Sequence, residues 1–229
     1  MQRHQTLALI PKGKKNIVAV FVLYERKTNN AMLIAVWQNV FKSAIIKCPV
    51  HEKQGNKSTD EGGVTMRKKA LVIIDIQNDI TKNYKDVIGP INQAIDWAAS
   101  KDIHVIYIRH ENLSAGTRTF KPNTHGSELA SDLKIVSKNV FTKYKGNALS
   151  SEEFTDFIGK NEICEFYIAG ADAVACVKST CYNLCKANYG VHVLSDCVTS
   201  YDKRKIDEML RYYESKGSRI ICLKDLLAG

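Results

Sequence analysis

The chain has 229 residues, of which 45% are hydrophobic and 25% are charged, an ordinary composition for a globular protein with a full core. No apolar run is long enough to cross a membrane, and the N-terminus lacks the pattern of a secretory signal. We therefore expect a cytoplasmic protein without membrane contact. In that compartment the seven cysteines should be reduced thiols and not a disulfide framework.

The net charge of +9 is concentrated at the front of the chain. Residues 1–65 carry ten Lys and Arg against four Asp and Glu, whereas residues 66–229 carry 23 against 20. The larger part is nearly balanced and contains no block of like charges, so the charge does not indicate binding to nucleic acid.

Residues 1–65 and 66–229 are expected to differ in kind. The first part ends in the polar tract HEKQGNKSTDEGG (51–63), which has the composition of a linker. Met66 is followed by basic residues and then by an apolar run typical of a buried strand. Codons for Glu61-Gly62-Gly63 can contain GGAGG, the core of a bacterial ribosome-binding site, a few nucleotides before the Met66 codon. Our hypothesis is that Met66 is the natural start and that residues 1–65 are translated upstream sequence. The alternative is a genuine N-terminal extension.

Apolar runs and amphipathic stretches alternate through residues 66–229. Strands are predicted over 70–76, 103–110, 165–171, 190–196 and 219–223. Helices are predicted over 87–101, from Ser150 or Ser151 onward, from after Asp172 to about Asn188, and over 202–217. A loop rich in Gly, Pro, Thr and Asn fills 112–126. This alternation predicts an α/β fold with a parallel sheet, right-handed crossovers and helices on both faces.

Two polar side chains fall at the carboxyl ends of predicted strands, where such sheets bind ligands. Asp75 lies near the end of the first strand, and a carboxylate there either has a function or is satisfied by neighbouring backbone amides. Cys176 follows the strand that ends at Ala171, with Cys181 and Cys185 shortly after it. These three cysteines could be buried helix residues, metal ligands, or one nucleophile with two neighbours. We interpret Cys181 and Cys185 as buried, because they share one helical face with no histidine at ligand spacing.

Three segments in order carry a resemblance to a known family: LVIIDIQND (71–79), NVFTKYKGNAL (139–149) and YIAGADAVACVKST (167–180). Together they resemble the isochorismatase-like cysteine hydrolases, which include nicotinamidases, N-carbamoylsarcosine amidohydrolase and ureidoacrylate amidohydrolases. The resemblance covers residues 66–229 and none of residues 1–65. It implies a doubly wound, mostly parallel six-stranded sheet of Rossmann-like type, and we expect a homo-oligomer, either a dimer or a tetramer.

The resemblance also places roles on particular residues. It implies that Cys176 is the nucleophile, that Asp75 is the general acid/base, and that Lys143 is the third catalytic member. It further implies a non-proline cis peptide between Ala171 and Asp172. The backbone amides of Asp172 and Cys176 would then form an oxyanion hole.

The chemistry expected of these groups follows from their surroundings. A helix start and a nearby lysine should lower the pKa of the Cys176 thiol. Asp75 should take the thiol proton and pass it to a leaving amine, while Lys143 holds Asp75 ionised. The alternative for Lys143 is a solvated surface lysine beside Lys138 and Lys145, and Lys145 would then be the candidate in its place.

The second predicted strand departs from the pattern of metal-dependent nicotinamidases, which resemble one another in an Asp-x-His pair followed by later histidines. Here YIRHENLSAG has Arg109 and Glu111 around His110. We therefore expect neither a metal nor another cofactor. A threonine often found three residues before the nucleophile is Ala173 in this chain.

The loop after this strand resembles that of the metal-free members, in which it lines the substrate pocket. His110, Arg118 and Phe120 are the side chains that we expect to face a substrate. If the substrate carries a carboxylate, Arg118 is the first candidate to bind it, and a solvated loop cation is the alternative.

The sequence thus predicts a cofactor-independent hydrolase of a small amide, carbamoyl or ureido compound. It would act through a thioester on Cys176 and release ammonia or an amine. One alternative is vinyl ether hydrolysis of the isochorismatase type, which is disfavoured because enzymes of that type lack the nucleophilic cysteine. The other is a catalytically silent member that serves as an interaction subunit, which the presence of Asp75, Lys143 and Cys176 disfavours.

Overall fold

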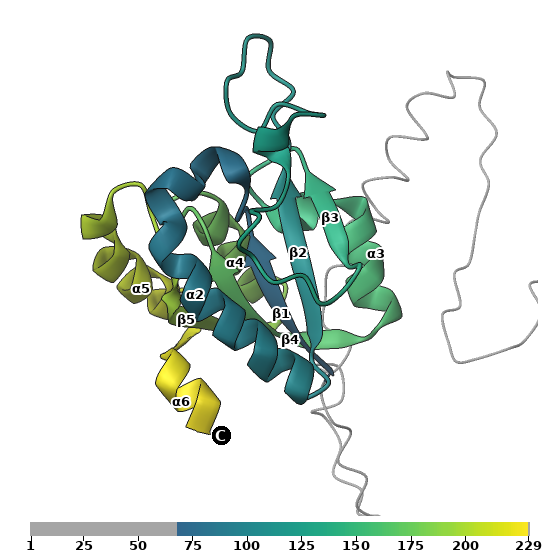
Figure 1. The fold of residues 1–229 in the computed structure, drawn as a ribbon. Coiled ribbons are helices and arrows are strands. Elements are labelled where there is room, and N and C mark those ends of the chain that lie inside the picture. The colour runs from purple at the N-terminus through teal and green to yellow at the C-terminus, as the bar shows by residue number, and fades with distance from the viewer. Residues whose placement is uncertain (1–67, 229) are drawn as a thin grey trace, which may run out of the picture. The chain divides into compact units, whose positions relative to one another are not determined.

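The computed structural model describes residues 68–228 (Figure 1). The hypothesis about Met66 and residues 1–65 lies outside this range. The elements in chain order are β1 (Lys68–Ile74), α2 (Asn78–Ser100), β2 (His104–His110), η2 (His125–Ser127), β3 (Val140–Lys143), η3 (Ala148–Ser150), α3 (Glu152–Lys160), β4 (Ile163–Gly170), α4 (Cys176–Lys186), β5 (Gly190–Val198), η4 (Lys203–Lys205), α5 (Ile206–Ser215), β6 (Arg219–Ile221) and α6 (Leu223–Ala228).

The six strands form one sheet in the order β3-β2-β1-β4-β5-β6, and every neighbouring pair is parallel. The predicted doubly wound α/β architecture is confirmed, and the sheet is wholly parallel. From β1 the chain builds outward to β3, and it then returns to the other side of β1 as β4. The direction of winding therefore switches between β1 and β4, and in open parallel sheets such a switch point opens a crevice at the carboxyl ends of the strands.

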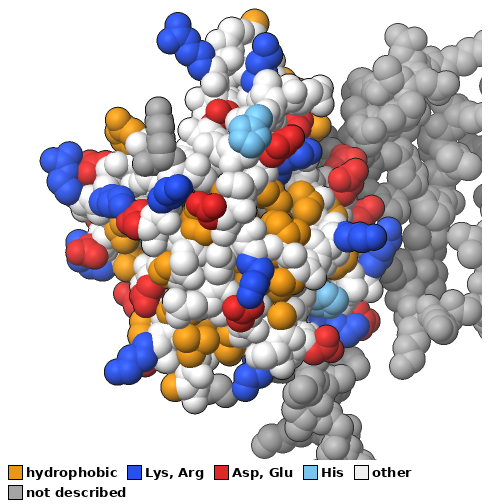
Figure 2. All heavy atoms as spheres, viewed as in Figure 1, with side chains coloured by type: hydrophobic (Ala, Val, Ile, Leu, Met, Phe, Trp, Pro, Cys, Tyr) orange, Lys and Arg blue, Asp and Glu red, His pale blue; other side chains and the backbone are white. Residues whose placement is uncertain are grey.

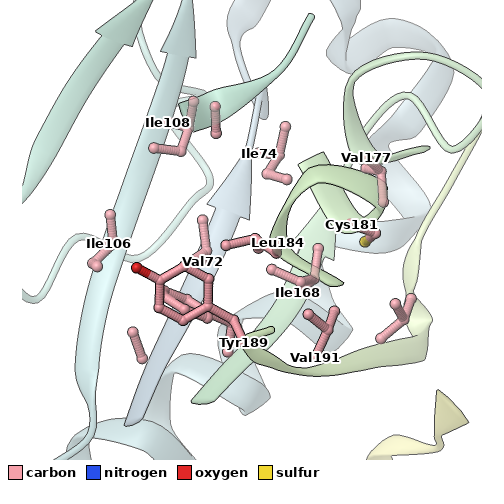
Figure 3. Close-up of a cluster of buried hydrophobic side chains, with 14 of the residues drawn as sticks. Val72, Ile74, Ile106, Ile108, Ile168, Val177, Cys181, Leu184, Tyr189 and Val191 are labelled. Atoms are coloured by element: carbon pink, nitrogen blue, oxygen red, sulfur yellow. The ribbon is translucent and has the colours of Figure 1, made fainter. Parts of the chain in front are cut away.

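Two hydrophobic clusters cover the two faces of the sheet. Alternate residues of β1 point to opposite faces, so that Leu71 and Ile73 pack toward α2 and α6 while Val72 and Ile74 pack toward α3, α4 and α5. Figure 1 shows α2 in front of the sheet and α4 behind it. Figure 3 shows the second cluster, in which Cys181 of α4 lies among aliphatic side chains and is only 1% exposed.

Three elements differ from the sequence prediction, and the first is the short strand β3, which was not among the five predicted strands. Helix α2 begins earlier than predicted, at Asn78, because Tyr84 and Val87 continue the buried stripe that Ile88 and Ile91 predicted. Helix α6 was not predicted at all. It is six residues long and buries Leu223 and Leu226 in the cluster on the α2 face.

The visible surface mixes charges of both signs without a large patch of either (Figure 2). This agrees with the nearly balanced charge of residues 66–229. Among residues 68–228, no helix is both long enough and apolar enough to span a bilayer.

Candidate active site

Asp75, Lys143 and Cys176 come from three distant parts of the chain and meet at one end of the sheet. Asp75 directly follows β1, Lys143 is the last residue of β3, and Cys176 is the first residue of α4. Because the strands are parallel, the segments that follow them emerge at the same edge, where the loop between β2 and β3 also rises (top of Figure 1).

Lys143 lies at the centre of this group. Its Nζ is 2.8 Å from Asp75 Oδ2, 3.1 Å from His110 Nδ1 and 3.3 Å from Cys176 Sγ. Its side chain is 0% exposed, so the alternative of a solvated surface lysine is wrong, whereas Lys145 is exposed. A buried ammonium needs partners of opposite charge or with lone pairs, and these three groups supply them.

Asp75 is buried, and its backbone adopts an uncommon conformation. Its φ of 55° lies in the left-handed region, which aspartate tolerates better than most residues. Burial raises the pKa of the Asp75 carboxyl above its usual value, while the charge of Lys143 acts in the opposite direction. Its Oδ1 is buried and has no hydrogen-bond partner among residues 68–228. The carboxylate therefore keeps one oxygen with which it can accept a proton.

The pKa of the Cys176 thiol is raised to about 12. The main cause is burial, followed by the negative charge of Asp75, and together they outweigh the opposing effect of Lys143. The expectation of a lowered thiol pKa is therefore wrong. It considered the helix start and the lysine, whereas the cost of removing a thiolate from water is larger here. At neutral pH the resting sulfur of Cys176 is therefore a thiol.

The end of β4 is built on a close backbone contact. Gly170 has a φ of 121°, and a Cβ at this position would lie only 2.1 Å from the carbonyl oxygen of Ile74. Only glycine allows β4 to approach β1 so closely at the residue before Asp75. The next peptide bond, between Ala171 and Asp172, is cis.

The segment between this bond and α4 presents backbone donors and an anchored carboxylate. Within residues 68–228, the backbone N–H groups of Asp172 and Cys176 donate to no backbone or side-chain acceptor. The Asp172 carboxylate accepts four hydrogen bonds at 2.8 to 2.9 Å, from the Val174 and Tyr201 N–H groups and from the Ser200 and Tyr84 hydroxyls. These bonds fix the segment to α2 and to the residues after β5.

A pocket of about 330 Å³ opens beside the thiol, a volume suited to a small ligand. Its walls are Asp75, Ile80, Tyr84, His110, Asn112, Thr119, Phe120, Asp172, Ala175 and Cys176. Of the three side chains expected to face a substrate, His110 and Phe120 line the pocket, with their rings edge to face at 5.5 Å. Arg118 is exposed on the loop and is not part of the wall.

His110 is held as a neutral ring. Burial lowers its pKa to about 4, and the adjacent Lys143 charge acts in the same direction. Since Lys143 Nζ can only donate, the geometry fits a ring whose Nδ1 accepts and whose Nε2 carries the proton.

Two residues that shape the site were not singled out from the sequence. Gln77 is fully buried. Its amide accepts from His110 N–H at 2.8 Å and donates to His110 O at 2.9 Å and to Ser127 O at 2.7 Å. Asp79 Oδ2 accepts a hydrogen bond from Phe120 N–H at 2.6 Å. The signal was present in IDIQND, because an amide directly after a buried strand must find partners in the interior.

The side chains near the pocket do not fit the metal centre of the metal-dependent nicotinamidases. Arg109 forms an ion pair with Glu111 at 3.3 Å, and the Nδ1 of His110 faces an ammonium group. In the part of the chain that the structure describes, no group of three or more His, Cys, Asp or Glu is arranged to hold a metal ion. Cys181 is core, and Cys185 is half-buried with its sulfur 3.3 Å from the Ser218 hydroxyl.

Known proteins resemble this chain in both sequence and fold. The chain is 24% identical to Isochorismatase family protein 2A of Dictyostelium discoideum over 161 residues, which are 68% of this chain and 78% of that protein. Its fold is similar to that of the pyrazinamidase of Pyrococcus horikoshii in complex with zinc, with a TM-score of 0.60 and 20% identity, covering 68% of this chain and 99% of that one. It is also similar to N-carbamoylsarcosine amidase from Thermoplasma acidophilum, with a TM-score of 0.61 and 19% identity, covering 68% and 96%.

The family model described as the Isochorismatase domain matches residues 69–225, which is nearly all of the described part of the chain and well over half of the whole. The resemblance found in the three sequence segments is therefore confirmed. The chain belongs to the isochorismatase-like hydrolase family.

Proposed function

We propose that this protein hydrolyses the C–N bond of a small amide, carbamoyl or ureido compound through a thioester on Cys176. The observation that carries the proposal is the position of Lys143 Nζ, which contacts both Asp75 Oδ2 and Cys176 Sγ at the wall of a ligand-sized pocket. A thiol with a proton acceptor beside it, and a cation in contact with both, is an arrangement in which the neighbouring base can activate the nucleophile during the reaction.

The first step would be attack by sulfur on the substrate carbonyl carbon. Asp75 Oδ1 accepts the thiol proton while the C–S bond forms, and the carbonyl electron pair moves onto oxygen. Lys143 contacts both the carboxylate and the sulfur, so its charge stabilises the negative charge as it passes from Asp75 through sulfur toward the carbonyl oxygen. The raised pKa of Asp75 makes this transfer less uphill, because it brings the two proton affinities closer together.

The tetrahedral oxyanion would be stabilised by the N–H groups of Asp172 and Cys176. Its collapse breaks the C–N bond, and protonated Asp75 gives its proton to the leaving nitrogen, which departs as ammonia or an amine. Asp75 next takes a proton from water as the oxygen of that water attacks the thioester. The C–S bond breaks, the acid is released, and sulfur regains the proton.

The test is a screen of the full chain for release of ammonia or amine from a panel of amides and ureides. We expect Cys176→Ala to lower kcat/KM on any active compound by roughly a thousandfold or more. Cys185→Ala is the matched control, since Cys185 is a half-buried cysteine of the same helix outside the pocket, and it should retain activity.

Covalent catalysis predicts one further observable. Intact-mass measurement of the Cys176-containing protein under rapid quench should show an added acyl group that is absent from the Ala variant. Turnover that survives Cys176→Ala would refute the thioester. Hydrolysis of vinyl ethers with no release of nitrogen from any amide would favour the isochorismatase-type alternative instead.

A further inference from the structure

The charged groups around the pocket do not cancel. Lys143 is balanced by its hydrogen-bonded partner Asp75, and Cys176 and His110 are neutral at pH 7. Asp172 is the remaining charged residue in the wall. Its four hydrogen-bond partners are hydroxyl and backbone N–H groups, which carry no charge. Among residues 68–228 no ion pair joins Asp172 to a Lys, Arg or His.

Two arginines, Arg109 of β2 and Arg118 of the loop after it, form no ion pair with Asp172. Arg109 pairs with Glu111 and donates to Thr142 Oγ1. Arg118, the expected partner for a substrate carboxylate, is exposed and outside the wall. A second carboxylate, that of Asp79, lies beneath the loop and holds the backbone of the pocket residue Phe120.

The rest of the wall is suited to an uncharged group. Ile80, Tyr84, Phe120 and Ala175 present apolar or aromatic surface to the pocket. The hydroxyl of Tyr84 is already committed to Asp172 Oδ2 at 2.9 Å, so this ring offers mainly its face. An acyl part that carried a carboxylate would be placed among apolar groups and near an unneutralised anion, an arrangement that disfavours binding.

We infer that Asp172 is a specificity-determining residue that excludes anions, so that the substrate of the proposed reaction is an amide or urea whose acyl part bears no carboxylate. The statement about the substrate rests on the proposed function. The preference of the pocket for uncharged ligands concerns binding alone and does not depend on hydrolysis. A substrate of this kind has no carboxylate for Arg118, the first candidate from the sequence to bind one, and leaves Arg118 with its alternative of a solvated loop cation.

The experiment therefore measures binding with a protein that cannot turn over its ligand. Full-length Cys176→Ala protein is titrated by calorimetry with two amides of nearly the same shape, 4-nitrobenzamide and 4-carbamoylbenzoate. The nitro group is neutral and the carboxylate that replaces it is anionic. We expect the anion to bind roughly tenfold or more weakly, the difference that one unscreened like charge in a pocket typically makes.

Two further variants in the Cys176→Ala background assign the preference. Asp172→Asn removes the charge and should bring the ratio of the two dissociation constants, carboxylate over nitro compound, closer to one, even if both ligands bind less well. Thr119→Lys adds a cation at an exposed position of the wall and should reverse the ratio in favour of the carboxylate. Equal or tighter binding of the anion by the parent protein, or a ratio that Asp172→Asn leaves unchanged, would overturn the inference.

Turnover separates this inference from the proposed function. If the protein with Cys176 intact cleaves no amide while the neutral ligand still binds preferentially, the proposed hydrolysis fails and the charge preference survives. If it cleaves the nitro compound and the carboxylate compound with equal kcat/KM, the hydrolysis survives and the charge preference fails.

Discussion

Gly170→Ala should be among the most damaging single-methyl substitutions in this protein, because of where Gly170 lies. The new Cβ would be 2.1 Å from Ile74 O and 2.6 Å from Ile74 N, both backbone atoms of the central strand β1. Backbone atoms cannot move aside as the end of a long side chain can. The two central strands would have to separate at the point where Asp75 begins the active site.

The size of the effect follows from two terms. A φ of 121° is a conformation that L side chains rarely adopt, and holding one there costs of order 1–3 kcal/mol. Overpacking of a rigid interior typically costs another 1–3 kcal/mol, which brings the sum to about 4 kcal/mol. For a domain of this size each kcal/mol lowers Tm by about 2–4 °C, so we expect a decrease of roughly 8–16 °C.

The assay is thermal unfolding followed by circular dichroism, with urea unfolding as a second measure of the free energy. Gly159→Ala is the matched control, because Gly159 is an exposed residue of α3 and its added Cβ would meet no atom within 4 Å. Alanine is the better helix former, so the control should be more stable by roughly 0.5–1 kcal/mol. A Gly170→Ala protein within about 1 kcal/mol of the parent would refute the reasoning.

Three other predictions concern the site. Because the pKa of its thiol is raised, Cys176 should react with iodoacetamide more slowly than a free cysteine at pH 7, and the rate should rise about tenfold per pH unit toward pH 10. Peptide mapping measures the rate of labelling at Cys176. Labelling of Cys176 at pH 7 that is faster than that of a free cysteine would contradict the raised pKa. Lys143→Met should lower kcat/KM about a hundredfold or more, while Lys145→Met, at an exposed position, leaves it unchanged in the same ammonia-release assay. The lowered pKa of His110 means that the unfolded chain takes its proton first, so stability should fall as pH drops from about 6.5 toward about 4; His110→Gln should lessen the difference in Tm between pH 7 and pH 5, and an unchanged difference counts against the buried neutral ring.

Much of the architecture could be predicted from periodicity alone. Buried parallel strands are short, uninterrupted hydrophobic runs rich in β-branched residues. For this reason β1, β2, β4 and β5 could each be predicted from its own segment of the sequence. The rule that sites lie at the carboxyl ends of such strands then singled out Asp75 and Cys176 before any side chain was placed. Helix α6 escaped because six residues are too few to display a period, and its burial depends on a face formed by α2.

The electrostatic state of the site could not be predicted in the same way. A sequence shows that a lysine and a helix start accompany Cys176, but it does not show how much water reaches the thiol. Burial decides the sign of the pKa shift here, and burial is a property of the assembled fold. The partners of Gln77 were hidden for a related reason, since they lie 33 and 50 residues away in the chain.

The amide of Gln77 has a consequence for how this protein can diverge. It forms hydrogen bonds with His110 at one end and Ser127 at the other, so the two ends of the intervening loop are held together and the loop forms a closed ring. Residues 112, 119 and 120 of the pocket wall belong to that ring, whereas Asp75, Lys143 and Cys176 do not. Insertions and substitutions near the tip of the ring, around Gly116, can therefore accumulate without moving the reacting groups. The part of the selectivity that this ring supplies can therefore change without changing the chemistry, whereas Asp172, on the segment that leads to Cys176, lies outside the ring.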